Sequence, residues 1–149
     1  MLDETDQKIV ELLKEDASLS THKIAKKTLI PQTTVLHRIK KLRKEGIIKK
    51  YTIELDYKKL EKNVKALIFV KVDKRLTDKL YKGTGMIEGA LIKQDFILNI
   101  KRLMGDYDFV IEAIFKDVDE LDMLLQKKIR SIDCISETKT IVVLNEWNS

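Results

Sequence analysis

The chain has 149 residues, 44% of them apolar, and a formal net charge of +5, which predicts one medium-sized or two small globular domains. No apolar run approaches the ~18 residues of a membrane span, and the acidic first eight residues lack the apolar core of a signal peptide. Because Cys134 is the single cysteine and the two histidines lie far apart, we expect a cytoplasmic protein with no disulfide, metal or cofactor.

The positive charge is concentrated near the start of the chain. Residues 1–60 contain 14 lysines and arginines against 9 acids, whereas residues 61–149 contain 15 of each. Within residues 38–50 seven basic side chains accompany one acid, Glu45. Such a local basic segment is typical of a nucleic-acid-binding surface, although a solvated helix face can have the same composition.

Two short helices are predicted first. Asp3 suits the N-cap of a helix whose apolar stripe includes Ile9. Ser20 suits the N-cap of a second helix over residues 21–27, with Ile24 facing inward. A turn over residues 28–31 follows.

A third helix is expected over residues 32–45, because Pro31 favours a helix start and Gly46 favours a helix stop. Val35, Ile39 and Leu42 have the spacing of a buried stripe. The positions opposite that stripe carry hydroxyl, basic or imidazole groups and no acid: Thr33, His37, Lys40, Lys41 and Lys44.

Two short helices, a tight turn and a basic third helix predict a helix-turn-helix motif that reads the DNA major groove, about 12 Å wide. Residues at the N-terminal end of the reading helix enter the groove first, so we expect base contacts from Gln32, Thr33, Thr34 and His37. Leu36 either touches a thymine methyl group or packs. Salt-sensitive phosphate contacts are expected from Arg38, Lys40, Lys41, Arg43, Lys44, Lys49 and Lys50.

After this helix the alternating residues 47–55 predict a strand, either a wing or a linker, that places Lys49 and Lys50 near the DNA backbone. We therefore expect a DNA-binding domain at residues 1–50, a linker strand and hinge at 51–63, and a second domain, used for oligomerisation, at 64–149.

The second domain is predicted to be α+β. Strands are expected over residues 64–72, 97–104, 107–115 and 135–144, and helices over residues 77–93 and 117–132. The inward residues of the first helix are Leu80, Thr84, Ile87 and Leu91; those of the second are Val118, Leu121, Leu125 and Ile129. The order βαββαβ is that of a ferredoxin-like fold. Its open sheet face needs a cover, so we expect a homodimer through this domain.

The layout resembles the Lrp/AsnC family of transcription regulators over nearly the whole chain. The matching residues in the first domain and linker are Leu2, Asp3, Asp6 and Ile9, then Thr34, Val35 and 38–42, then 46–48, Tyr51, Leu55 and Asp56. Those in the second domain are Gly105, Asp106, Tyr107 and Asp108, then Thr138 and 140–143. The hairpin at residues 105–108 is the most specific element, because it lies at the right distance behind a helix-turn-helix.

The resemblance implies an effector-binding C-terminal domain, amino acids as effectors, and dimers that assemble into tetramers or octamers. It implies an effector pocket between dimers, near Met104, Gly105, Asp106, Tyr107, Asp108 and Thr138. The family usually has glycine in the helix-turn-helix turn and a serine N-cap before a proline, where this chain has Leu29, Ile30 and Pro31. Lysine outnumbers arginine 24 to 5, which suits a thermophile or an AT-rich genome, and we expect an archaeal source.

The sequence therefore predicts a sequence-specific, nucleoid-associated transcription regulator that binds double-stranded DNA. A non-specific architectural DNA-binding protein would use the same basic segment. A ferredoxin-like enzyme is the third alternative, but the sequence offers no set of catalytic residues.

Overall fold

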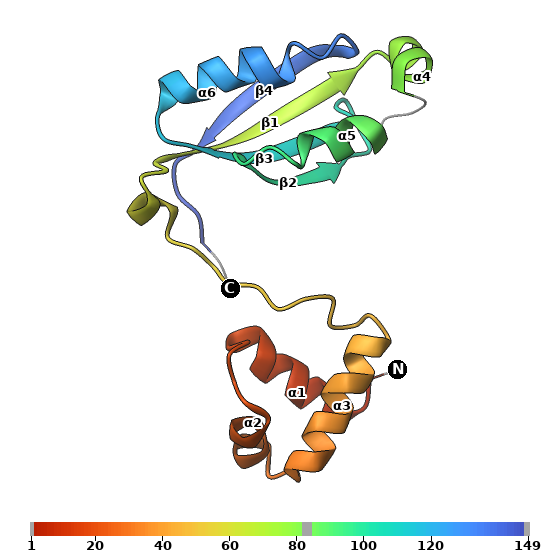
Figure 1. Cartoon of the computed structure of the whole chain (residues 1–149), viewed down its shortest axis with the longest axis vertical. Coiled ribbons are helices and arrows are strands. Elements are labelled where there is room, and N and C mark those ends of the chain that lie inside the picture. Colours follow the sequence, from red (N-terminus) through yellow and green to blue (C-terminus); the bar gives the residue numbers. More distant parts are fainter. Residues whose placement is uncertain (1, 82–84, 148–149) are drawn as a thin grey trace. The chain divides into compact units, whose positions relative to one another are not determined.

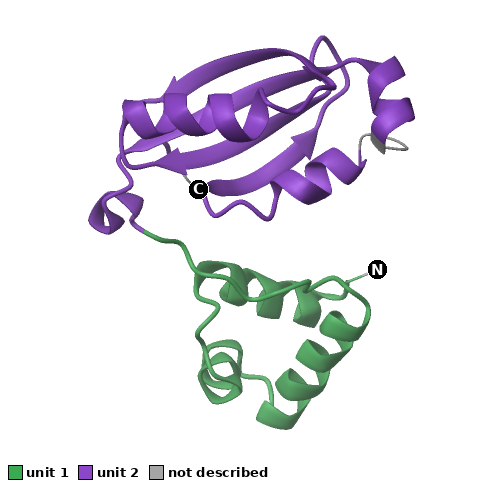
Figure 2. Ribbon diagram, turned by 45° about the horizontal axis from the view of Figure 1, so that its top comes forward, with its two compact units in different colours: residues 1–55 green, residues 56–149 purple. Residues whose placement is uncertain are grey.

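The computed structural model describes residues 2–81 and 85–147. It divides the chain into two compact units, residues 1–55 and residues 56–149 (Figure 2). Each unit has an apolar core of its own. Within the described ranges, no helix is both long and apolar enough to cross a membrane.

Three helices form the first unit, as predicted (Figure 1): α1 (Glu4–Glu15), α2 (Thr21–Thr28) and α3 (Gln32–Lys44). The two predicted caps are present. The amide of Asp6 donates to Asp3 Oδ1 at 2.8 Å, and the amide of Lys23 donates to Ser20 Oγ at 3.2 Å. Pro31 precedes the first turn of α3, where its missing amide hydrogen costs nothing.

The core of the first unit consists of Ile9 from α1, Ile24 from α2, and Val35, Ile39 and Leu42 from α3, all of them buried. The predicted inward stripe of α3 is confirmed. Because this stripe holds α3 against the other two helices, the opposite face of α3 is the one exposed to solvent.

The turn between α2 and α3 contains Leu29 in a left-handed conformation, with φ of 58°. Its side chain is 91% exposed. A residue with a Cβ atom destabilises this conformation by roughly 1–2 kcal/mol, which is why glycine usually occupies it. The leucine thus adopts the backbone geometry of the glycine that the family resemblance would place here.

The strand expected after α3 is not formed. Gly46, at φ of 72°, turns the chain, and the amides of Ile47 and Ile48 donate to the carbonyl of Leu42 at 2.9 and 3.1 Å. Residues 49–56 then run outside any sheet and leave Ile53 77% exposed. A strand requires a neighbour for its backbone groups, and the described part of a single chain provides none for this segment.

A four-stranded antiparallel sheet forms the second unit: β1 (Val64–Val72), β2 (Ile97–Arg102), β3 (Phe109–Phe115) and β4 (Ile135–Val143). The strand order is β2-β3-β1-β4. Alternate residues of β1, including Ile68 and Val70, are buried under α5 and α6, which lie on one face of the sheet (Figure 1). The predicted βαββαβ ferredoxin-like fold is confirmed.

The helices of this unit differ in detail from the prediction. They are η1 (Tyr57–Leu60), α4 (Lys74–Tyr81), α5 (Gly85–Leu91), α6 (Val118–Leu124) and the π-helical turn η2 (Leu125–Ile129). The single helix expected over residues 77–93 is therefore wrong, and Thr84 of its stripe lies outside the described residues. α4 begins earlier than predicted, where Asp73 Oδ1 accepts from the amide of Arg75 at 2.9 Å. Its core-facing residue is consequently Thr77, whereas Leu80 is 51% exposed.

The N-terminus of α6 is capped by two acidic side chains. The amide of Glu120 donates to Asp117 Oδ1 at 2.8 Å, and Glu120 Oε2 accepts from the amide of Lys116 at 2.6 Å. Val118 was expected to face inward, but it is 61% exposed because it lies in the first turn, before the helix reaches the sheet. The other predicted inward residues are buried: Leu121, Leu125 and Ile129.

Candidate nucleic-acid interface

The exposed face of α3 lies opposite its buried stripe. No acidic side chain occurs between Gln32 and Lys44. Leu36 is 43% exposed on the flank of this face. The exposed face itself carries the five side chains expected there: Thr33, His37, Lys40, Lys41 and Lys44. A protruding helix with this charge suits a groove bounded by two phosphate backbones.

The N-terminal end of α3 presents Gln32 and Thr33 to solvent, whereas Thr34 is half-buried. The side-chain amide of Gln32 is not free, because its Nε2 donates to Thr21 Oγ1 of α2 at 3.2 Å. The two helices of the motif are therefore joined by side chains on their first residues.

Arg38 has a different environment from the other basic residues of α3. Its guanidinium forms an ion pair with Asp3 and a second one, at 3.3 Å, with Asp6, which is buried. The hydrogen bond that its guanidinium donates to the Asp3 carboxylate raises the pKa of Arg38. The amide of Asp6 and then Arg38 lower the pKa of the Asp3 carboxyl. Arg38 thus fastens α3 to the first turn of α1.

The other cations fall into two groups. Lys41 is 4.0 Å from Glu45, and the guanidinium of Arg43 lies 5.8 Å from the ring centre of Tyr51. In the ranges that the structure describes, the remaining four are exposed and form no ion pair: Lys40, Lys44, Lys49 and Lys50. These four ammonium groups can reach phosphates without breaking an internal ion pair.

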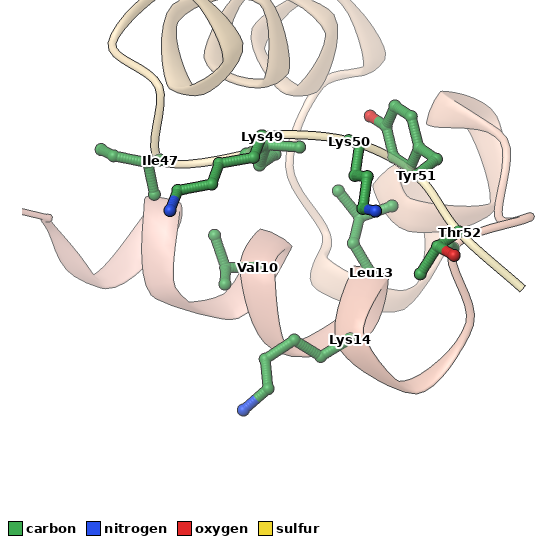
Figure 3. Close-up of a pocket in the computed structure, with 10 residues that line it drawn as sticks. Val10, Leu13, Lys14, Ile47, Lys49, Lys50, Tyr51 and Thr52 are labelled. Carbon is green, nitrogen blue, oxygen red and sulfur yellow. The ribbon is translucent and has the colours of Figure 1, made fainter. Parts of the chain in front are cut away.

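Lys49 and Lys50 lie on the segment that crosses α1, where a cavity of about 510 Å³ has an apolar floor. Figure 3 shows Val10 and Leu13 pointing from α1 toward this segment, with Lys14 pointing away from it. After Gly46 the segment therefore runs over α1 without pairing in a sheet.

The hairpin between β2 and β3 contains five of the six residues expected to bind an effector; the sixth, Thr138, lies in β4. Met104 is fully exposed, and Gly105 has a φ of 153° that side chains rarely adopt. The side chain of Asp108 is already engaged, because its Oδ2 accepts from the amide of Val72 at 2.8 Å. This aspartate therefore joins the hairpin to the end of β1, and Asp106 is the more accessible of the two carboxylates.

Tyr107 and Thr138 lie on opposite faces of the sheet. Tyr107 stacks on Phe69, 5.6 Å between ring centres, and donates from its hydroxyl to Glu137 at 2.9 Å. This hydrogen bond raises the pKa of Tyr107. Thr138 pairs with Val70 on the helix-covered face and accepts from Arg130 Nε at 2.8 Å. One chain thus does not bring all six expected effector residues into one pocket.

Three structural contributors to the interface were not identified from the sequence. Asp3 and Asp6 have a helix-start pattern, which gives no sign that they also bind Arg38. Thr21 lies eleven residues from Gln32, and no local spacing rule connects an N-terminal hydroxyl of one helix to the next helix. A threonine directly after a capping serine was the only available signal.

Comparison with known proteins agrees with both units. Residues 2–49 match a family model described as winged helix-turn-helix DNA-binding, and residues 65–149 match the Lrp/AsnC ligand binding domain. The HTH-type transcriptional regulator FL11 of the archaeon Pyrococcus furiosus is 32% identical over 144 residues, covering 97% of this chain and 90% of the relative.

Solved structures show the same fold. AsnC of E. coli has a TM-score of 0.83 at 25% identity, covering 98% of this chain and 94% of its own. A transcriptional regulator of Neisseria meningitidis, determined in complex with L-Met, has a TM-score of 0.88 at 22% identity, covering 100% and 94%. Helix α3 carries no acidic residue, the second unit is ferredoxin-like, and the regulator relatives match nearly the whole chain. The chain belongs to the Lrp/AsnC family of transcriptional regulators.

Proposed function

We propose that α3 enters the major groove and selects a DNA sequence through its N-terminal residues. The observation that carries this proposal is the exposed, acid-free face opposite Val35, Ile39 and Leu42. Base contacts come from the side chains nearest the helix start and on this face: Gln32, Thr33, Thr34, Leu36 and His37. Threonine, glutamine and histidine offer the donors and acceptors that base edges require.

Phosphate contacts come from the cations that have no internal ion pair, namely Lys40, Lys44, Lys49 and Lys50, together with Lys41 and Arg43. Arg38 acts mainly through α1, because two carboxylates already hold it. Each phosphate contact releases counterions, so the affinity falls with salt concentration in proportion to the number of contacts.

Selection of bound sites from random DNA, with the full chain at physiological salt and excess competitor, tests sequence-specific reading. We expect a preferred site that loses its preference in the Thr33→Ala/His37→Ala variant. Binding to a promoter fragment no tighter than to random DNA would contradict the proposal and favour an architectural role. An enzymatic role has no support in the regulator relatives.

We propose a homodimer through the sheet face that α5 and α6 leave open. This face carries Leu67, Phe69 and Val110, all half-buried, and Ile141, which is 43% exposed. The extended residues 49–56 offer a second place for pairing between copies. A dimer places two reading helices on one particle, which suits half-sites about 34 Å apart or a multiple of that distance. Tetramers or octamers of such dimers fit the family, and light scattering of the purified chain measures the assembly.

We propose an amino acid as effector, bound near the hairpin of residues 104–108 where a second copy completes the pocket. The Lrp/AsnC ligand-binding model and the L-Met complex of the Neisseria regulator support this proposal. Exposed Met104, Gly105 and Asp106 are available to such a ligand, with Tyr107, Asp108 and Thr138 supporting the site. Melting curves of the chain with each amino acid test this proposal. The effector should raise the melting temperature, and Asp106→Asn should reduce that rise. We propose that the protein is located in the cytoplasm, on the nucleoid, because it binds double-stranded DNA.

A further inference from the structure

We infer that Thr21 orients Gln32 to read an adenine in the DNA site; this inference rests on the proposed reading of DNA by α3. Thr21 is the first residue of α2 and is half-buried, whereas Gln32 is the first residue of α3 and is exposed. Gln32 Nε2 donates to Thr21 Oγ1 at 3.2 Å. The reading residue nearest the helix start is therefore held by a residue of the bracing helix.

The hydrogen bond determines which groups of Gln32 remain available. A glutamine amide has two N–H donors and one carbonyl acceptor. In the proposed arrangement Thr21 accepts from the N–H that is trans to the carbonyl oxygen, which leaves the cis N–H and that oxygen for another partner. The amide then presents a donor and an acceptor side by side, in a fixed order.

This remaining pair matches adenine. In the major groove adenine presents N7 as an acceptor and its N6 amino group as a donor, so a glutamine amide can bind both atoms at once. Guanine presents two acceptors, N7 and O6, and would set O6 against the carbonyl oxygen of Gln32. The order imposed by Thr21 therefore favours adenine.

The neighbouring hydroxyls do not serve this purpose. Ser20 Oγ accepts from the amide of Lys23 at 3.2 Å as the cap of α2. At the other end of α2, Thr28 Oγ1 donates to the carbonyl of Ile24 at 2.8 Å. Thr21 is thus the α2 hydroxyl that contacts the reading helix, and Thr28 provides a matched control on the same helix.

The test selects bound sites from random DNA with the full wild-type chain and with Gln32→Ala, Thr21→Val, Thr28→Val and the Thr21→Val/Gln32→Ala variant. We expect Gln32→Ala to abolish a preference for adenine at one position. Thr21→Val should reduce that preference by about fivefold or more, the scale of losing part of a bidentate base contact. The double variant should match Gln32→Ala, and Thr28→Val should match the wild type.

Replacing the selected adenine by 7-deazaadenine removes the N7 acceptor alone. The wild type should then lose affinity, whereas Gln32→Ala should not. Thr21→Ser keeps the acceptor oxygen and should retain the preference, which separates the hydrogen bond from any effect of Thr21→Val on folding; melting curves of each variant measure that effect.

Three results would overturn the inference: an unchanged adenine preference in Thr21→Val, loss of the preference in Thr21→Ser with a normal melting curve, or a Gln32-dependent preference for another base. If the wild-type chain selects no sequence at all, the proposed reading of DNA fails, and the failure is visible before any variant is compared.

Discussion

At the scale of single residues, Leu29 combines a left-handed backbone with an almost fully exposed side chain. Replacing Leu29 with glycine should raise the stability of the first unit by about 0.5–1 kcal/mol, because relief of backbone strain exceeds the added freedom of the unfolded chain. Leu29→Ala keeps the strain and serves as the control. Thermal denaturation measures both, and a lower melting temperature for Leu29→Gly than for Leu29→Ala would show that the turn is unstrained.

Arg38 and Lys40 lie two positions apart on α3 but should act differently. Arg38→Met leaves the buried Asp6 carboxylate without its partner, so we expect a clear fall in melting temperature with little change in the salt dependence of DNA binding. Lys40→Met should leave the melting temperature unchanged and reduce the slope of log affinity against log salt concentration by about 1. The opposite assignment of these two effects would make Arg38 the phosphate contact.

The Asp3 carboxyl connects stability with pH. The amide of Asp6 and Arg38 hold its pKa below the ordinary value of 3.8. A depressed pKa contributes stability that is present above pH 3.8 and is lost as the pH falls through the folded-state pKa. Asp3→Asn retains a cap acceptor without the charge. The wild type should therefore be more stable than Asp3→Asn at pH 7, and the difference should disappear as the pH falls below 3.8 through the folded-state pKa. A pH-independent difference would exclude this linkage.

At the scale of secondary-structure elements, the cap of α6 is a separable contribution. Asp117→Ala removes the acceptor for the amide of Glu120 and should cost about 1 kcal/mol of unfolding free energy. Asp119, in the same first turn, caps nothing, so Asp119→Ala should cost only the smaller helix-dipole contribution. Urea denaturation measures both, and equal losses would indicate a general charge effect.

The elements predicted correctly from the sequence are those whose stability depends on their own residues. Val64–Val72 was predicted to the residue because seven of its nine residues are apolar and five of these are β-branched or aromatic. The strand after α3 was wrong because the described chain offers no neighbour for the backbone groups of residues 49–56. In α4, Asp73 starts the helix early and rotates Thr77 inward, a tertiary outcome that the apolar spacing of Leu80 did not indicate.

The candidate interface also combines features that the sequence predicts with contacts that it does not. The outward face of α3 follows from helical periodicity and from the position of its buried stripe, so its residues were predictable. The two Arg38 ion pairs join residues that are 32 and 35 positions apart in the sequence, and the Thr21–Gln32 hydrogen bond joins residues that are 11 positions apart. Such contacts depend on how three helices pack, and local sequence patterns contain no information about them.

At the scale of the whole molecule, the proposed dimer can be tested on the open sheet face. Leu67→Lys places an ammonium group opposite Ile141 on that face and should shift the chain from dimer to monomer. The neighbouring Glu112 already forms an ion pair with Lys65, so the new cation would be buried at the interface without a partner of its own. Met123→Lys, on exposed α6, is the matched control and should stay dimeric. Light scattering measures the mass, and DNA with two half-sites should lose its advantage over one half-site only in Leu67→Lys.

The small core of the first unit makes its stability depend on what binds to it. A three-helix unit of 55 residues with five buried apolar side chains belongs to a size class that retains little stability of its own. A ligand that binds only the folded form stabilises it by mass action, by about 2.7 kcal/mol at a hundred times its dissociation constant. DNA that binds only the folded first unit therefore stabilises that unit. On warming, free chains should unfold this unit at a lower temperature than chains that are bound to DNA.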